Sequence, residues 1–366
     1  MHFWMEKGVK GFRFDVINLI SKAGFEDDFS VDGDGRSFYT DGLRIHEFLQ
    51  ELARDSFAKD KDIITVGEMS STTMENCYKY AGEKTGELSM VFTFHHLKVD
   101  FMGNEKWVLV PTDFMKLKQL IFDWQINMEK NNAWNAVFWC NHDQPRVISR
   151  FGSDDKYHKE SGKMLATLIH CLRGTPYIYQ GEEIGMTNYP FRTLEELNDI
   201  ESLNYAKEAL EKGASLEVIM DQIRQVGRDN ARTPMQWDTS KNAGFSISDK
   251  TWLPVNPNYK DINVESALAN PESIFYTYQK LVALRKTQDW LVDADFELLE
   301  TASKVFAYIR KTKDSSYLVV VNLSDQEQDF CYDFERAEVV IANIELEPIT
   351  DQGKLQAWDA ICVKMK

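Results

Sequence analysis

Three carboxylates stand at the ends of short apolar runs in this chain: Asp15, Glu68 and Asp143. Two carboxylates about 5 Å apart suit a retaining glycosidase, in which one attacks the sugar and the other donates a proton to the leaving group. A third, ionised carboxylate can stabilise an oxocarbenium-like transition state or hold sugar hydroxyls. The residue types therefore predict nucleophilic and acid/base chemistry on a glycoside.

The surroundings of these carboxylates indicate a division of roles. Arg13 precedes Asp15 by two residues, so a strand would place both side chains on one face, where the guanidinium favours an ionised Asp15. Glu68 follows IITVG, and burial at the end of such a run favours the protonated form that a general acid needs. Plainer interpretations stay open, because Arg13 and Asp15 can form a structural ion pair and Glu68 can make a surface contact.

Other kinds of site find little support in the sequence. The segment 32–42 (DGDGRSFYTDG) looks slightly like a calcium loop, but Arg36 and Leu43 occupy positions where an EF-hand needs oxygen ligands. His95 and His96 have no partner at metal-ligand spacing. Dinucleotide, P-loop and GxSxG motifs are absent from the sequence. We therefore expect neither a metal nor a cofactor.

Composition narrows the range of partners. The chain has 366 residues, of which 43% are hydrophobic, and its formal net charge is −16. Such an acidic protein is a poor candidate for nucleic-acid binding, which depends on Lys and Arg at phosphates. No stretch approaches 18 apolar residues, so we expect no membrane partner. Five cysteines without CxxC spacing suit the reduced thiols of a cytoplasmic protein. The oligomeric state is not indicated by the sequence.

The elements that must position the carboxylates alternate between strands and helices. Short apolar runs predict strands at 11–19, 63–69, 88–94, 135–142 and 175–181. Helical periodicity lies between them, at 41–57, 113–128 and 161–174. Repeated β-then-α units predict a parallel sheet covered by helices. In α/β barrels, the polar residues at the carboxyl ends of the strands form the active site.

The second half of the chain changes its pattern. Residues 190–260 look like an insertion with helices at about 193–212 and 215–227, and a last helix is expected at 273–288. From residue 289 onward, short β-branched runs predict a small antiparallel sandwich. We therefore expect a catalytic α/β domain over 1–288 and a β-sandwich domain over 289–366.

Several motifs resemble one family. GFRFD (11–15), ITVGE (64–68) and FWCNHD (138–143) resemble strand motifs of the α-amylase superfamily, glycoside hydrolase family 13. GTPYIYQGEEIGMTN (174–188) and RDNARTPMQW (228–237) resemble its oligo-1,6-glucosidase branch. The similarity extends over essentially the whole chain.

The resemblance implies roles for individual residues. Asp15 matches the nucleophile, Glu68 the acid/base and Asp143 the transition-state stabiliser of the family. The residues that match those holding the first glucose unit are Arg13, His142 and Arg228. Val16 matches the form that is typical of enzymes without a preference for α-1,4 links.

One stretch of the sequence narrows the range of substrates expected within that branch. FHHLKVDFMGNEKW (94–107) resembles the trehalose-6-phosphate hydrolases, which implies cleavage of trehalose 6-phosphate to glucose and glucose 6-phosphate. Because the protein is acidic, a phosphorylated sugar needs local cations, and we expect Lys98 and Lys106, with His96, on a loop beside the substrate. The alternative is an oligo-1,6-glucosidase or dextran glucosidase acting on isomaltose-type sugars, in which these lysines are solvated surface charges.

The resemblance also implies that part of the family fold is missing. The five predicted strands match the fourth to eighth strands of the (β/α)8 barrel, so we expect a partial TIM barrel beginning at an internal methionine. On this interpretation the chain alone is inactive or weakly active. A truncated, inactive product and a non-catalytic interaction subunit are the further alternatives. The second is disfavoured, since all three carboxylates are present and no membrane anchor is seen.

Overall fold

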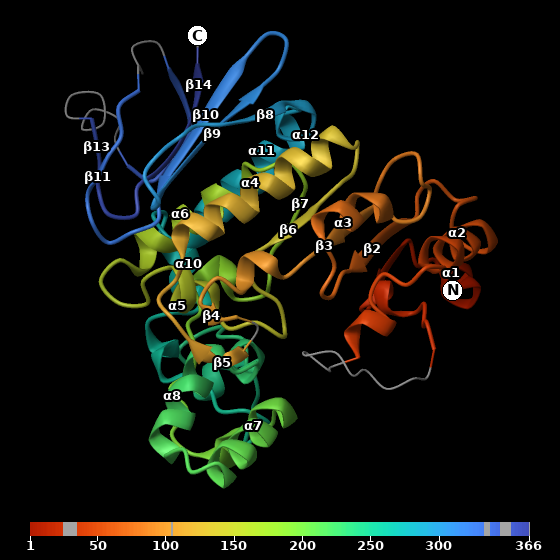
Figure 1. Cartoon of the computed structure of the whole chain (residues 1–366). Coiled ribbons are helices and arrows are strands. Elements are labelled where there is room, and N and C mark those ends of the chain that lie inside the picture. Colours follow the sequence, from red (N-terminus) through yellow and green to blue (C-terminus); the bar gives the residue numbers. More distant parts are fainter. Residues whose placement is uncertain (25–34, 104, 333–336, 345–352, 366) are drawn as a thin grey trace. The chain divides into compact units, whose positions relative to one another are not determined.

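The computed structural model describes residues 1–24, 35–103, 105–332, 337–344 and 353–365. These residues divide into two compact units. Unit 1 comprises residues 1–99, 116–137 and 173–175, and unit 2 comprises residues 100–115, 138–172 and 176–366. Figure 1 labels the helices and strands of both units.

Unit 1 is built on a three-stranded parallel sheet in the order β1-β2-β3. The strands are β1 (Gly11–Phe14), β2 (Ile64–Glu68) and β3 (Met90–Phe92). Its helices are α1 (His2–Glu6), α2 (Ile45–Asp55), α3 (Met74–Tyr80) and most of α4 (Phe114–Lys130). Because parallel strands end at the same edge of a sheet, the residues after β1, β2 and β3 share one edge.

Helix α2 packs in the core of unit 1 through one apolar face. Ile45, Leu49 and Ala53 recur every four residues and are all buried, while the charged residues lie on the other face of the helix. Ile45 and Leu49 join a core cluster with Met69 and Val91, which follow β2 and lie in β3. This packing holds the ends of β2 and β3 in place.

The chain passes between the units within two further strands, β6 (Ala136–Phe138) and β7 (Thr175–Tyr177), which pair with each other. A parallel bridge joins Val91 of β3 to Asn135, the residue just before β6. The alternation of strands and helices that the sequence predicts is therefore present, although each strand is shorter than its apolar run.

Unit 2 contains a hairpin, a set of helices and a C-terminal sheet. The hairpin is β4 (Phe101–Met102) and β5 (Glu105–Leu109). The helices are α5 (Val147–Phe151), α6 (His158–His170), α7 (Ile200–Glu211), α8 (Leu216–Val226), α9 (Asp229–Arg232), α10 (Val264–Ala269), α11 (Ile274–Thr287) and α12 (Trp290–Asp293). Short 3-10 turns complete the connections of both units, at Ile17–Leu19, Arg36–Phe38, His95–Leu97, Glu182–Ile184, Leu194–Glu196, Lys241–Gly244 and Pro257–Lys260.

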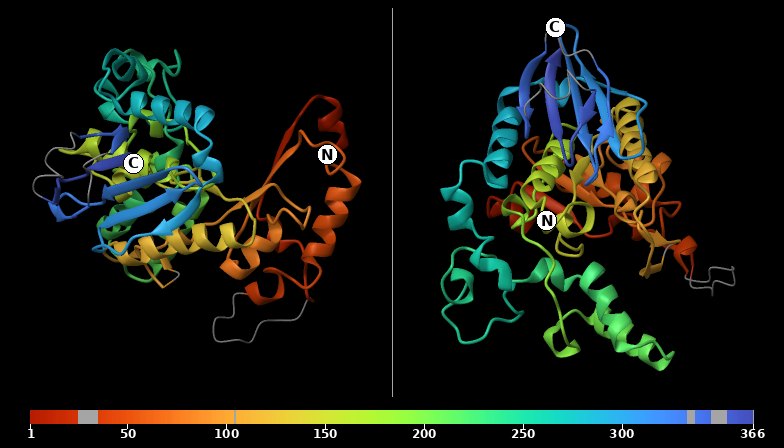
Figure 2. Two further views of the ribbon diagram at one scale, coloured as in Figure 1. Left: turned by 90° about the horizontal axis from the view of Figure 1, so that it is seen from above. Right: turned by 90° about the vertical axis from the view of Figure 1, so that its left-hand side faces the viewer.

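The C-terminal strands form an antiparallel sheet in the order β12-β14-β10-β9-β8, which Figure 2 shows in blue. They are β8 (Asp295–Leu298), β9 (Val305–Lys311), β10 (Ser316–Asn322), β12 (Glu338–Ala342) and β14 (Ala360–Met365). A second, two-stranded sheet consists of β11 (Gln328–Asp329) and β13 (Lys354–Leu355). Leu355 packs in one buried cluster with Val320 and Ile361, so apolar side chains fill the space between the two sheets. Helix α6 packs on β10 and β14, and α11 packs on α6 (Figure 1).

Two expectations about local structure are wrong. The strand predicted over 11–19 ends at Phe14, because Val16 adopts a left-handed conformation (φ 35°, ψ 46°) and a 3-10 turn follows. Lys106, expected on a loop, lies in strand β5. The possible calcium loop at 32–42 lies partly outside the described residues.

Candidate active site

Arg13, Asp15 and Glu68 meet at the carboxyl edge of the sheet in unit 1. Arg13 in β1 is paired with Val66 of β2, so the end of β2 lies alongside Asp15. The Arg13 guanidinium makes ion pairs with both carboxylates, through Nη1 to Asp15 and Nη2 to Glu68. Period-two alternation along parallel strands accounts for this meeting, because all three side chains leave the sheet on one face.

The environment of Glu68 favours its protonated form. Glu68 is buried, with only 7% of its surface exposed. Burial is the main cause that raises its pKa above the usual value, and the neighbouring Asp15 carboxylate raises it further, while the Arg13 charge acts in the opposite direction. The Asp15 side chain is far more exposed, at 77%. One carboxyl group is thus disposed to carry a proton, and its neighbour is exposed and paired with a guanidinium, an arrangement that suits acid-assisted nucleophilic displacement.

The backbone turns sharply after Asp15. Val16 has φ 35° and ψ 46°, a left-handed conformation that β-branched residues rarely adopt. Such conformations persist only where the surrounding structure holds them, and they are concentrated at functional sites. The turn ends β1 and leaves Asp15 exposed at the edge of the sheet.

Two predicted ligands of the substrate come shortly after β3. His96 lies in the 3-10 turn His95–Leu97, and Lys98 comes directly after it. The ring of His95 packs against Trp124 in a tilted arrangement, with a centroid distance of 4.7 Å, which holds this turn against α4. Burial lowers the pKa of Lys98, and the nearby positive charge of Arg36 lowers it further. Arg36 donates to the Ser71 hydroxyl at 2.9 Å, so it lies beside the loop that follows Glu68.

Unit 2 carries the second group of predicted site residues, around Asp143. His142 Nε2 lies 3.2 Å from Asp143 Oδ2. Arg232 Nη2 donates to Asp143 Oδ1 at 2.5 Å, and its Nε donates to the backbone carbonyl of His142 at 2.8 Å. Arg228, which we expected beside the substrate, is farther from the same oxygen, at 3.7 Å. Arg232 is therefore the main partner of Asp143 in this unit.

A network of alternating charges continues from Arg228. Arg228 donates to Asp199 through Nη2 at 2.6 Å, and its Nε lies 3.1 Å from Glu201. Glu201 in turn accepts from Lys106 Nζ at 2.5 Å. Burial lowers the pKa of Lys106, although the Glu201 charge opposes this shift. Stacking of Trp107 on Tyr205, with centroids 4.2 Å apart, joins β5 to α7 and keeps Lys106 at this position.

The sequence did not single out Arg232, Asp199 or Glu201. Arg228 and Arg232 are four residues apart, a spacing that places two side chains on the same face of a helix, and this signal was available in RDNARTPMQW. Asp199 and Glu201 had no comparable local signal, because they lie about thirty residues before the arginine that they contact.

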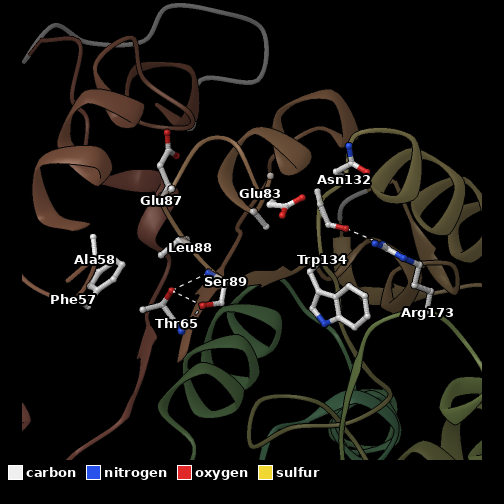
Figure 3. A pocket seen from close by; sticks show the side chains of 14 residues that line it. Phe57, Ala58, Thr65, Glu83, Glu87, Leu88, Ser89, Asn132, Trp134 and Arg173 are labelled. Atoms are coloured by element: carbon white, nitrogen blue, oxygen red, sulfur yellow. Dashed lines mark hydrogen bonds between the residues drawn. The ribbon is translucent and has the colours of Figure 1, made fainter. Parts of the chain in front are cut away.

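Unit 1 also contains a cavity of about 530 Å³, shown in Figure 3, at the opposite edge of its sheet. Thr65 and Ser89, at the start of β2 and just before β3, bond to each other there. Glu87 accepts from His46 at 2.9 Å, and Arg173 donates to the carbonyl of Ala133 at 2.8 Å. Several polar groups in and beside this cavity are therefore bonded to one another, and the cavity lies at the edge of the sheet opposite to Asp15 and Glu68.

In the described ranges, no group of three or more His, Cys, Asp and Glu residues is arranged to hold a metal ion. Nor does any helix in those ranges have the length and apolar character needed to cross a membrane.

Comparison with known proteins places this geometry in a family. Residues 1–294 match the family described as "Alpha amylase, catalytic domain". The chain belongs to this family, glycoside hydrolase family 13. The resemblance seen in the sequence is confirmed, and so is the general fold class, a TIM-barrel domain followed by a C-terminal sheet domain.

Individual relatives carry different names. The chain is 52% identical over its whole length to a glucan 1,6-alpha-glucosidase of Streptococcus pneumoniae and 46% identical to a trehalose-6-phosphate hydrolase of Bacillus subtilis. It is also similar to the crystal structure of trehalose-6-phosphate hydrolase from Bacillus licheniformis, with a TM-score of 0.92, 47% identity and all of this chain covered. The chain spans 66% of the length of each of these three proteins.

Proposed function

We propose that this protein is a retaining α-glucoside hydrolase. Asp15 attacks the anomeric carbon while Glu68 protonates the oxygen of the departing sugar, and the glycosidic C–O bond breaks. Glu68, now ionised, then removes a proton from water, which hydrolyses the glucosyl–Asp15 ester. Asp143 stabilises the positive charge that develops on the sugar. The observation that carries this proposal is the contact of Arg13 with both Asp15 and Glu68, one carboxyl exposed and the other buried with a raised pKa.

We infer that the substrate is trehalose 6-phosphate. The supporting observation is the proximity of two cations, Lys98 after β3 and Arg36 in the turn Arg36–Phe38. Within the described ranges no carboxylate pairs with the Lys98 ammonium, which is half-buried and repelled by Arg36. A half-buried cation next to a second cation is a place where an anion binds well, and charge-assisted contacts to phosphate are among the strong hydrogen bonds. The phosphate of the departing sugar supplies this anion at the carboxyl edge of the sheet, near the loop that follows Glu68.

An α-1,6-glucosidase acting on isomaltose-type sugars is the second candidate, favoured by a different observation. Lys106, expected to bind phosphate, is paired with Glu201, so its charge is already neutralised. A neutral sugar can be held by such an ion pair through its hydroxyl groups without displacing either partner. The relative with 52% identity carries a name that fits this activity.

The test is glucose release from trehalose 6-phosphate and from isomaltose, measured side by side on protein purified from its natural source. A strong preference for trehalose 6-phosphate is the expected result. A preference for isomaltose would establish the second candidate, and hydrolysis of neither sugar would contradict the proposal. The 366-residue chain, assayed in parallel, tests the expectation that it is inactive or weakly active by itself.

A further inference from the structure

The Asn18 side chain joins the two loops that follow Asp15 and Glu68. Asn18 lies three residues after Asp15 and is fully buried. Its Nδ2 donates to the carbonyl of Ser70 at 2.8 Å, and its Oδ1 accepts from the Ser70 amide at 2.9 Å. Ser70 lies two residues after Glu68. One side-chain amide thus closes a pair of hydrogen bonds like those between neighbouring strands, at a point beyond the end of both strands.

Asp41 holds Asn18 in the orientation that makes this link. Asp41 Oδ1 accepts from Asn18 Nδ2 at 3.1 Å, and the Asp41 amide donates to the Asn18 carbonyl at 3.0 Å. The same carboxylate accepts from Thr72, just after Ser70, at 2.7 Å and from the buried Tyr80 at 2.5 Å. Because Asp41 contacts both loops and α3, the amide of Asn18 has one orientation that satisfies all of its partners.

We infer that Asn18, oriented by Asp41, is a positioning residue that sets the separation of the Asp15 and Glu68 carboxyl groups. Asn18 touches neither the reacting atoms nor the substrate. The left-handed turn at Val16 sends the chain directly from Asp15 into the segment that Asn18 anchors. A retaining hydrolase needs its two carboxyl groups about 5 Å apart, and a misplacement of about 1 Å costs about 100-fold in rate. This inference rests on the proposed retaining mechanism.

The test is Asn18→Ala in the protein as it occurs in its natural source, with 4-nitrophenyl α-glucoside and trehalose 6-phosphate as substrates. We expect kcat to fall by about 100-fold on trehalose 6-phosphate. KM should change little. The alkaline limb of the kcat/KM profile should move to lower pH, because burial and the Asp15 charge both raise the pKa of Glu68 and both weaken when the loops separate. A role in stability alone would leave this limb in place.

The matched control is Asn76→Ala. Asn76 donates to the same carboxylate of Asp41, at 3.1 Å, but this bond comes from α3 and does not join the two loops. The Asn76→Ala variant should keep the wild-type kcat and pH profile. If Asn18→Ala does not fold, Asn18→Ser, which keeps one polar atom, takes its place, with rates normalised to the folded fraction.

The outcomes separate this inference from the proposed function. Unchanged kcat and pH profile in the Asn18 variant, or an equal loss in both variants, would overturn the inference while leaving the hydrolase proposal intact. A wild-type protein that hydrolyses neither substrate would contradict the hydrolase proposal itself, before any variant is compared.

Discussion

Replacing Lys98 by alanine tests the substrate directly. Lys98 is half-buried and has Arg36 as a cationic neighbour, so its ammonium is less screened by water than an exposed lysine. A hydrogen bond to a charged group contributes about 1.5–3 kcal/mol. At 1.4 kcal/mol per tenfold, Lys98→Ala should lower kcat/KM for trehalose 6-phosphate by about 10- to 150-fold. The loss should appear mainly in KM, since the phosphate is remote from the bond that breaks.

The assay is glucose release in a coupled reaction, for trehalose 6-phosphate and for isomaltose, at the same low salt concentration. Isomaltose carries no phosphate, so its kcat/KM should be nearly unchanged. Lys106→Ala is the matched control, because it removes the same side chain from a lysine whose charge is already paired with Glu201. Equal losses on both sugars, or a larger effect of Lys106→Ala on the phosphorylated sugar, would refute the assignment of Lys98 to the phosphate.

Three further changes test the charges of both units. Asp15→Asn removes a negative neighbour, so the pKa of Glu68 should fall, which NMR titration of labelled glutamate would detect; an unchanged value contradicts the coupling. Arg232→Gln removes a charged donor from Asp143, and kcat/KM should fall by about 10- to 150-fold, corresponding to about 1.5–3 kcal/mol; wild-type kcat/KM would argue against this role. Glu182 is buried, and burial raises its pKa to about 7, above its value in the unfolded chain. Ionisation of Glu182 should therefore lower the free energy of unfolding progressively as the pH rises from about 4.5 to 7, by about 3 kcal/mol in full. Glu182→Gln should therefore weaken the fall in the urea midpoint between about pH 5 and pH 8, and an unaltered pH dependence would count against it.

The sequence alone predicted the elements that depend on local pattern. The periodicity of Ile45, Leu49 and Ala53 predicted a helix with one buried face, and that helix is α2. The apolar runs that end in polar residues predicted β1, β2 and β3, although not their full bounds. The meeting of Arg13 with Asp15 followed from period-two alternation. These features need only short-range information, because the repeat of a helix or strand is written into consecutive residues.

Only the tertiary structure decided which charges meet. Lys106 and Glu201 are paired across 95 residues, and Arg232 and Asp143 across 89 residues. No local period encodes such pairs, since they depend on where loops and helices dock in unit 2. For the same reason Lys98 and Lys106 could not be distinguished from the sequence, while the structure shows that Glu201 neutralises Lys106.

The link between Asn18 and Ser70 is likewise a contact between residues that are remote in sequence. Asparagine is uncommon in strands, so an asparagine inside an apolar run predicts, from local sequence, only a weak interruption of a strand. The contacts that Asn18 makes depend on a left-handed turn at Val16 and on the carboxylate of Asp41, which lies 23 residues away. The sequence therefore determined which residues could do the chemistry and which elements carry them. The packing of loops decided which side chains hold those residues at working distance, because such contacts join segments that are remote along the chain.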